Sequence, residues 1–142
     1  MKLAIDSSSF AKRYIKETGS NKLDILLQHA SELALSIIVV PEIISALNRR
    51  LQEHALTDKE YQMLTRQLLD DVHDATILQL TPAAIAQSVK LLEMNVLQAM
   101  DALHVACALE WKADLFVTSD KKQLDAAMQA DLQCEYLQHT GE

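Results

Sequence analysis

The chain has 142 residues, the length of one domain that buries roughly two-thirds of the surface its unfolded form exposes, and we expect a single domain over residues 1–142. With 49% hydrophobic and 23% charged residues, its composition is that of a globular protein and argues against a disordered chain. The formal net charge of −7 argues against a protein that grips nucleic acid along a broad basic face, but it leaves room for acidic side chains that hold divalent cations.

Strands and helices are expected to alternate along the chain, with no repeat, low-complexity segment or long linker between them. In chain order we expect a strand at residues 2–6, helices at 8–17 and 22–31, a strand at 34–39, helices at 41–53 and 57–73, a strand at 76–80, helices at 83–94 and 100–111, a strand at 115–118, a helix at 121–129 and a strand at 134–137. This alternation predicts an α/β protein, a three-layer α/β/α sandwich with a mainly parallel sheet.

Local signals mark several of these boundaries. A serine is expected to cap the first helix, which ends near Gly19. Pro41 fits the first turn of a helix, because proline lacks only an N–H that would be unpaired there. Thr57 and Glu60 form the Thr-x-x-Glu pattern of a capping box, which opens the helix that ends near His73.

The N-terminus indicates a cytoplasmic protein with no membrane partner. After Lys2, only the three apolar residues 3–5 precede Asp6, too few for a signal-peptide core, and no run approaches the roughly 20 apolar residues of a membrane span. Cys107 and Cys134 have neither CxxC spacing nor a disulfide-rich context, so we expect reduced cysteines that pack in the interior.

Four carboxylates that lie far apart in the sequence are placed where a parallel α/β fold brings strand ends and helix starts to one edge of the sheet. They are Asp6, Glu42, Asp101 and Asp120. Asp6 and Asp120 each come just past the carboxyl end of an expected buried strand, the edge where open α/β sheets bind ligands. Glu42 and Asp101 each stand at the start of an expected helix. Together the four acids predict a metal site.

Carboxylate oxygens suit Mg²⁺, a hard octahedral ion that keeps waters, one of which can act as a nucleophile. We expect Asp6, Asp101 and Asp120 to contact such an ion directly or through water, and Glu42 to bind it or to orient the attacking water. Without the ion, these like charges raise one another's pKa. Each acid taken alone also fits a helix cap or a helix-start charge, so only their joint occurrence favours the metal site.

Basic residues and one histidine accompany these acids. His104 comes one turn after Asp101 and either touches the site or packs in the core. The lysines and arginines form three groups, and each group follows one of the acids in the sequence. A solvated helix face is the simpler interpretation of each group. The basic residues are Lys12, Arg13, Lys16, Arg49, Arg50, Lys121 and Lys122.

Four segments together resemble a known family. They read Leu-Ala-Ile-Asp-Ser-Ser at 3–8, Val-Pro-Glu at 40–42, Ala-Met-Asp-Ala-Leu-His-Val-Ala-Cys-Ala at 99–108 and Phe-Val-Thr-Ser-Asp at 116–120. This pattern resembles the PIN-domain ribonucleases of the VapC toxin type, and the resemblance covers essentially the whole chain. The stretch at 99–108 is its most specific part.

The resemblance implies a PIN-like fold and a Mg²⁺- or Mn²⁺-dependent endoribonuclease, often the toxin of a type II toxin–antitoxin system with an antitoxin as partner. It makes Asp6, Glu42, Asp101 and Asp120 the catalytic and metal-binding residues, with Ser8 and Thr118 as hydroxyl support. Some members carry a further acid shortly after the fourth position, where this chain has Lys122 and Gln123, so a second metal ion is less strongly implied than a first.

The resemblance also implies a homodimer. Its interface can include apolar residues of the expected helices at 57–73 and 41–53, although packing in the core is an equal alternative for the same residues. They are Leu64, Leu68, Leu69, Ile43 and Leu47.

Other chemistries find little support in the sequence. With Gly19 and Gly141 as the only glycines, neither a Walker loop nor a dinucleotide-binding fingerprint exists. A phosphatase of the haloacid dehalogenase type needs a second Asp where this chain has Ser8. Two alternatives remain open: a PIN-type RNA-processing nuclease without an antitoxin, and a catalytically idle protein-interaction module with the same fold. The sequence does not encode the RNA target.

Overall fold

The computed structural model describes residues 1–138, so His139 and Gly141 lie outside the described residues. Its strands form one five-stranded sheet in the order β3-β2-β1-β4-β5. The strands are β1 (Lys2–Ile5), β2 (Glu32–Ser36), β3 (Thr76–Leu78), β4 (Leu115–Thr118) and β5 (Cys134–Tyr136). Every neighbouring pair runs parallel, which confirms the predicted sheet and makes it parallel throughout the described chain.

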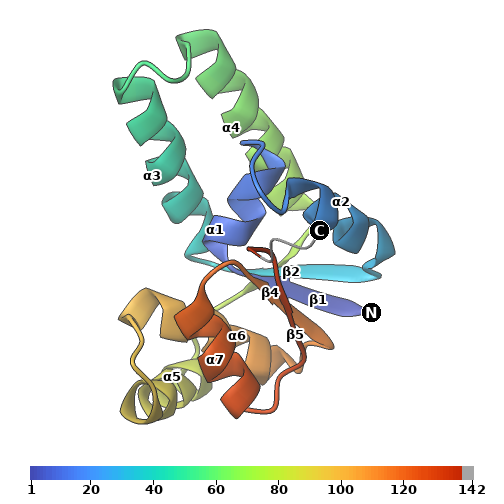
Figure 1. The fold of residues 1–142 in the computed structure, drawn as a ribbon, viewed down its shortest axis with the longest axis vertical. Coiled ribbons are helices and arrows are strands. Elements are labelled where there is room, and N and C mark those ends of the chain that lie inside the picture. The colour runs from blue at the N-terminus through green and yellow to red at the C-terminus, as the bar shows by residue number, and fades with distance from the viewer. Residues whose placement is uncertain (139–142) are drawn as a thin grey trace.

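Helices cover both faces of this sheet (Figure 1). On one face lie α1 (Ser7–Phe10), the short 3-10 helix η1 (Ala11–Arg13), α2 (Ser20–His29), α3 (Val39–Gln52) and α4 (Asp58–His73). On the other face lie α5 (Pro82–Met94), α6 (Ala99–Trp111) and α7 (Lys121–Gln129). The predicted three-layer α/β/α sandwich is therefore confirmed.

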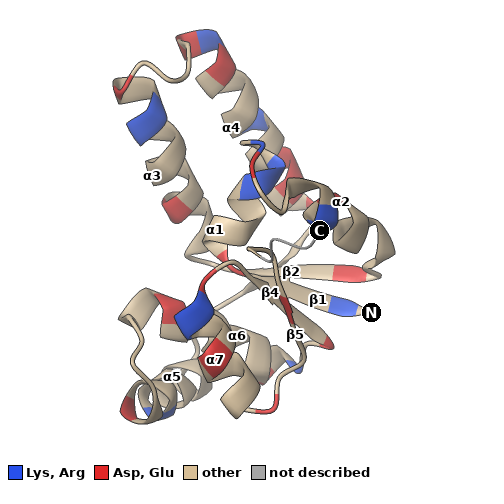
Figure 2. Ribbon diagram, in the orientation of Figure 1, with Lys and Arg blue, Asp and Glu red and all other residues tan. Residues whose placement is uncertain are grey.

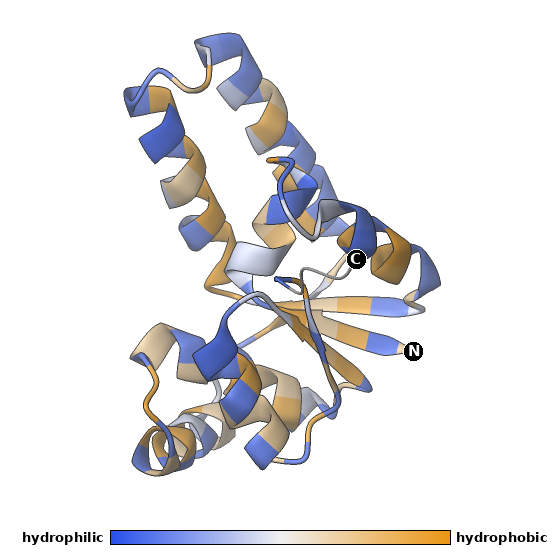
Figure 3. Cartoon of the chain, in the orientation of Figure 1, coloured by the Kyte–Doolittle hydropathy of each residue, from blue (hydrophilic) through white to orange (hydrophobic). Residues whose placement is uncertain are grey.

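The central strand β1 contributes to two hydrophobic cores, because successive side chains of a strand point to opposite faces. Leu3 and Ile5 pack with the first helix layer, whereas Ala4 packs with α6 and α7. Ala102 and Ala106 are fully buried, and these small side chains let α6 approach the sheet closely. Hydrophobic residues accordingly concentrate along the strands (Figure 3).

Helices α3 and α4 form a pair that extends away from the sheet (Figure 1). Ile43, Leu47 and Leu68 are buried in the core between them and the sheet, and Leu64 packs against that core. Leu69 is the exception, since 53% of it is exposed. Of the five residues considered for a dimer interface, core packing therefore accounts for all but Leu69.

The first helix differs most from the sequence-based expectation. We expect a helix over 8–17, but α1 gives way to η1, which ends at Arg13. The cap is Asp6 rather than a serine, since the Asp6 carboxylate accepts a hydrogen bond from the backbone N–H of Ser9. The helix start thus moves closer to the end of β1 than the serines suggest.

Other boundaries shift by a few residues. The strand expected at 34–39 ends at Ser36, and α3 begins two residues before Pro41, which remains in the first turn where its missing N–H costs nothing. The capping box is confirmed, because the side chains of Thr57 and Glu60 each accept from the backbone N–H of the other.

Gly19 begins α2 rather than ending the preceding helix. Its φ of 93° lies in the left-handed region, which glycine adopts without strain. A Cβ at this position would lie 2.5 Å from the carbonyl oxygen of Leu137. Glycine is therefore required both by the backbone conformation and by the segment that follows β5.

Cys107 and Cys134 are both free thiols, as expected. Burial raises the pKa of each thiol to about 11, so neither forms a reactive thiolate near neutral pH. Across residues 1–138, no helix has the length and apolar character needed to cross a membrane.

Candidate active site

The carboxyl ends of the two central strands place Asp6 beside Thr118. Strands β1 and β4 are parallel neighbours, with Ile5 opposite Val117. The backbone N–H of Asp6 donates to the carbonyl of Val117 across 3.2 Å, which extends the ladder one residue past β1. This edge lies between the two helix layers, with several acidic residues around it (Figure 2).

Asp6 is almost completely buried, with 2% of the residue exposed. Its carboxylate accepts hydrogen bonds from the backbone N–H of Ser9 at 3.0 Å and from the hydroxyls of Ser8 at 3.2 Å and Thr118 at 3.0 Å. Burial raises the pKa of Asp6, although the hydrogen bonds from Ser9 and Thr118 and the charge of the nearby His104 act in the opposite direction. Ser8 and Thr118 thus both contact the acid that they were expected to support.

Asp101 lies in the first turn of α6 and Asp120 at the N-cap of α7. The pKa of Asp101 is raised to about 6, first by burial, then by the charge and hydrogen bond of Asp120, and also by the charge of Asp6. Asp120 caps α7 by accepting from the backbone N–H of Lys122 at 3.0 Å. The fold therefore brings three of the four predicted acids, Asp6, Asp101 and Asp120, into one electrostatic cluster.

This cluster predicts a pH dependence of stability. The unfolded pKa of Asp101 is near 3.8 and its folded pKa is about 6, so the native state retains a proton that the unfolded chain releases. The stabilising contribution is complete below the unfolded pKa and is lost as the pH rises through about 6. We therefore expect Asp101→Asn to gain stability relative to the parent as the pH rises over this window. Urea unfolding of both proteins in chelator would show it, and parallel pH profiles would contradict it.

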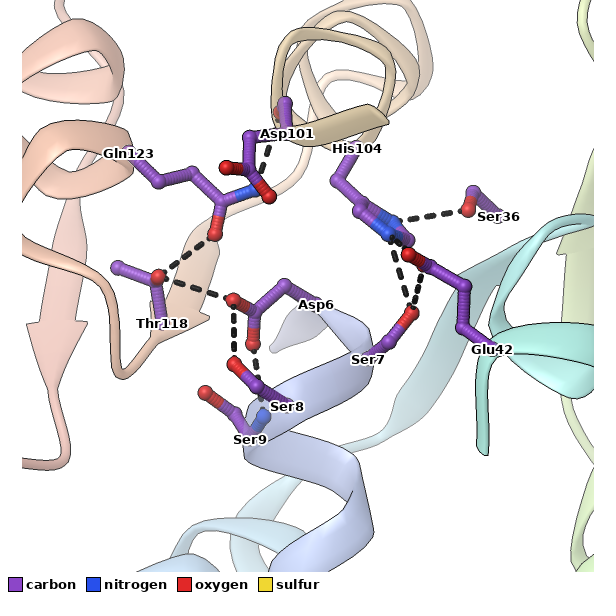
Figure 4. Close-up of polar contacts among 10 residues, drawn as sticks. All are labelled: Asp6, Ser7, Ser8, Ser9, Ser36, Glu42, Asp101, His104, Thr118 and Gln123. Atoms are coloured by element: carbon purple, nitrogen blue, oxygen red, sulfur yellow. Dashed lines mark hydrogen bonds and ion pairs between the residues drawn. The ribbon is translucent and has the colours of Figure 1, made fainter. Parts of the chain in front are cut away.

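Glu42 lies in a separate group, together with His104, Ser7 and Ser36 (Figure 4). Its Oε1 accepts a hydrogen bond from the Ser7 hydroxyl and lies 2.7 Å from Nε2 of His104. Burial raises the pKa of Glu42, but the hydrogen bonds from His104 and Ser7 outweigh it, so the net shift is downward. Glu42 thus faces His104 and Ser7, and the charge of His104 also acts on Asp6 and Asp101.

His104 is buried, as expected for a histidine that packs in the core. It is also part of this polar group. Its Nδ1 lies 2.9 Å from the hydroxyl of Ser36, while its Nε2 faces both Glu42 and Ser7. Both ring nitrogens therefore have partners, which orients the imidazole toward Glu42.

A divalent cation fits the chemistry of the three-aspartate cluster. Hard cations such as Mg²⁺ take carboxylate oxygens, and the mutual charge that raises the pKa of Asp101 is the repulsion that a cation relieves. Within residues 1–138, no three His, Cys, Asp or Glu side chains already converge closely enough to enclose an ion. Asp6, Asp101 and Asp120 would hold it, with waters completing the coordination, as Mg²⁺ commonly requires.

Several basic residues of the sequence analysis form ion pairs with acids other than the four candidates. The pairs are Lys12 with Glu17 at 2.9 Å, Arg13 with Asp71 at 2.7 Å and Lys121 with Asp125 at 2.6 Å. Arg13 and Asp71 also line a groove of about 540 Å³ that contains none of the candidate acids. These contacts favour a structural interpretation for Lys12, Arg13 and Lys121.

Sequence reasoning gave no role in the site to Ser7, Ser36 or Gln123, although Gln123 was noted as lying shortly after the fourth acid. The sequence shows that Ser7 lies next to Asp6. It does not show the partners of Ser7, which come from α3 and α6. Ser36 is the last residue of β2, so its position at a strand end, like that of Asp6, could have indicated it. Gln123 carried a weaker signal, a polar residue at a position of α7 that shares a face with the buried Ala126 and Ala127.

Comparisons with known proteins agree with this geometry. A family model described as the PIN domain matches residues 3–128. No curated protein sequence matches the chain. Among solved structures, FitAcB from Neisseria gonorrhoeae is 15% identical with a TM-score of 0.71, and the match covers 96% of this chain and 99% of that one.

Two further solved structures are similar. A toxin–antitoxin complex from Klebsiella pneumoniae is 14% identical with a TM-score of 0.66, and the match covers 86% of this chain and 89% of that one. VapC20 from Mycobacterium tuberculosis, described as a sarcin-ricin loop cleaving toxin, is 16% identical with a TM-score of 0.66, covering 87% and 94%. At these identities the likeness shows a common fold.

Proposed function

The chain belongs to the PIN-domain family, and from this premise we propose that it is a Mg²⁺- or Mn²⁺-dependent endoribonuclease, the toxin of a toxin–antitoxin pair. The observation that carries the proposal is the cluster of Asp6, Asp101 and Asp120 at the carboxyl ends of β1 and β4. A catalytically idle module has no need of a cluster that repels itself and raises the pKa of Asp101 to about 6.

The proposed mechanism assigns each group a task. Asp6, Asp101 and Asp120 would hold the cation, and Ser8 and Thr118 keep Asp6 in place. When bound, the ion supplies a water of lowered pKa and takes up charge from the phosphate in the transition state. Glu42 stays ionised because His104 and Ser7 hydrogen-bond to it, so it can accept a proton from the attacking water.

The partner proposed for this toxin is an antitoxin protein. Structural neighbours include a complex described as toxin–antitoxin, which supports this choice over a nuclease that works alone. We also propose a homodimer over a surface that includes the exposed Leu69 and Met63 of α4. Co-expression with the product of a short reading frame directly upstream should restore growth to a host that the chain arrests. If no neighbouring product does so, the nuclease without an antitoxin is the better proposal.

We expect the purified, metal-stripped chain to leave RNA intact and to cut it after Mn²⁺ or Mg²⁺ is added, because the aspartate cluster needs the ion for chemistry. Gel analysis of several single-stranded and structured RNAs, with and without chelator, measures this. Cleavage that persists in chelator would contradict the metal requirement. No cleavage by folded, metal-loaded protein would favour the idle interaction module.

A further inference from the structure

We propose that Gln123 is a positioning residue that ties the three aspartates together and thereby sets the affinity for the cation. This inference rests on the proposed function and names a residue of the same site. Gln123 is fully buried, with 0% exposed. A buried amide is expensive unless it is hydrogen-bonded, and this one bridges two different parts of the site.

The two ends of the amide reach different elements (Figure 4). Its Nε2 donates to the backbone carbonyl of Asp101 in the first turn of α6, across 3.0 Å. Its Oε1 lies 2.7 Å from the hydroxyl oxygen of Thr118 at the end of β4. One side chain of α7 therefore joins the helix that carries Asp101 to the strand that precedes Asp120.

Thr118 extends this bridge to the other two acids. Its hydroxyl oxygen lies 3.0 Å from Oδ2 of Asp6 and accepts from the backbone N–H of Asp120 at 3.1 Å. Thr118 is itself 0% exposed, so no bulk water competes for these contacts. Hydrogen bonds thus run from the carbonyl of Asp101 through the buried side chains of Gln123 and Thr118 to Asp6, and the N–H of Asp120 joins them at Thr118.

The hydroxyl of Thr118 has one proton and faces two acceptors. The acceptor on Gln123 is the nearer one, 2.7 Å away against 3.0 Å for Asp6. The two acceptors share this proton, so Gln123 weakens the hydrogen bond from Thr118 to Oδ2 of Asp6, which also accepts from Ser8. Gln123 therefore both holds the backbone of Asp101 and acts on Asp6 through Thr118.

The amide of Gln123 affects both folding and metal binding. Ala126 and Ala127 share the buried face of α7 with Gln123, so an apolar side chain of similar length would pack there. Without Gln123 the Thr118 hydroxyl still has Asp6 as an acceptor, whereas the carbonyl of Asp101 loses a partner, and such a loss destabilises the fold where the group stays unsatisfied. By contrast, losing a residue that hydrogen-bonds to a metal ligand typically weakens metal binding by about 10–100-fold.

The test measures Mn²⁺ affinity by titration calorimetry on the full chain, together with the metal-free melting temperature. We expect Gln123→Met to raise the Mn²⁺ dissociation constant by about 10–100-fold. The titration is made well below the metal-free melting temperature of the variant, so a fall in that temperature does not account for the weaker binding. Gln67→Met, at an exposed position of α4, is the matched control and should bind Mn²⁺ like the parent. Gln123→Asn keeps the amide but is one methylene shorter, so it should also weaken binding, and it serves if the methionine variant does not fold.

A double-mutant cycle separates a bridge from two independent contacts. Thr118→Val should weaken Mn²⁺ binding as well, and combining it with Gln123→Met should weaken binding by less than the product of the two single effects. Parental affinity in any folded Gln123 variant, or independent effects in the cycle, overturns the positioning role. If the parent itself does not bind Mn²⁺, the proposed function fails and this role fails with it.

Discussion

Asp101→Asn is expected to reduce metal-dependent RNA cleavage by about a thousandfold, equivalent to about 4 kcal/mol of transition-state stabilisation at 1.36 kcal/mol per factor of ten. The substitution keeps the shape of the side chain but removes one of the three negative charges proposed to hold the cation. Initial rates on a labelled RNA at saturating Mn²⁺ measure the effect. Asp58→Asn is the matched control, because Asp58 also lies in the first turn of a helix, α4, but away from the cluster.

Growth of a host that expresses the chain gives a second measurement of the same prediction. The parent should arrest growth, while Asp101→Asn should not, at equal soluble yield. Asp58→Asn should arrest growth like the parent. If Asp101→Asn remains both toxic and active, the aspartate cluster is not the catalytic site.

Mn²⁺ is expected to stabilise the parent by roughly 2.7 kcal/mol when present at about 100 times its dissociation constant, because it binds only the folded state. Asp120→Asn should lose most of this gain. Asparagine caps helices about as well as aspartate, so the variant keeps the hydrogen bond from the N–H of Lys122 and its metal-free stability should be unchanged or higher. Chemical unfolding with and without Mn²⁺ measures both quantities.

The outcome for Asp120→Asn distinguishes a cap from a ligand. A variant that responds to Mn²⁺ as the parent does would show that Asp120 acts only on α7. A variant that is less stable without metal, by about 1 kcal/mol, would show that the cap needs the charge of the carboxylate. Reduced Mn²⁺ stabilisation at unchanged metal-free stability is the result that the cluster predicts.

Much of the fold could be predicted because its signals are local. The capping box of Thr57 and Glu60 and the apolar runs before Asp6 and Asp120 depend on neighbours in the sequence, and these elements are found where they were expected. The helix over 8–17 was wrong because its end depends on distant contacts. Ser20 donates to the carbonyl of Lys12, and this contact holds a turn where periodicity alone favours a helix.

The site was predictable to the extent that topology determines it. Parallel strands bring Asp6 and Asp120 to one edge whatever the details of packing. Glu42 was placed with them because a helix start also faces that edge, but its direction depends on an imidazole 62 residues away. Such hydrogen bonds depend on how distant segments pack in the folded protein, and no sequence periodicity predicts them.

Strand β1 lies in the middle of the sheet, between β2 and β4, and this order has a consequence for synthesis on the ribosome. The first neighbour, β2, is translated soon after β1, but Thr118, which contacts Asp6, comes 112 residues later. At about 5–20 residues per second, that delay is roughly 6–22 seconds. Until then one edge of β1 has no partner and Asp6 has no second acid beside it from β4 or α7. The aspartate cluster therefore forms only when translation is almost complete, and the proposed nuclease activity would not appear before then.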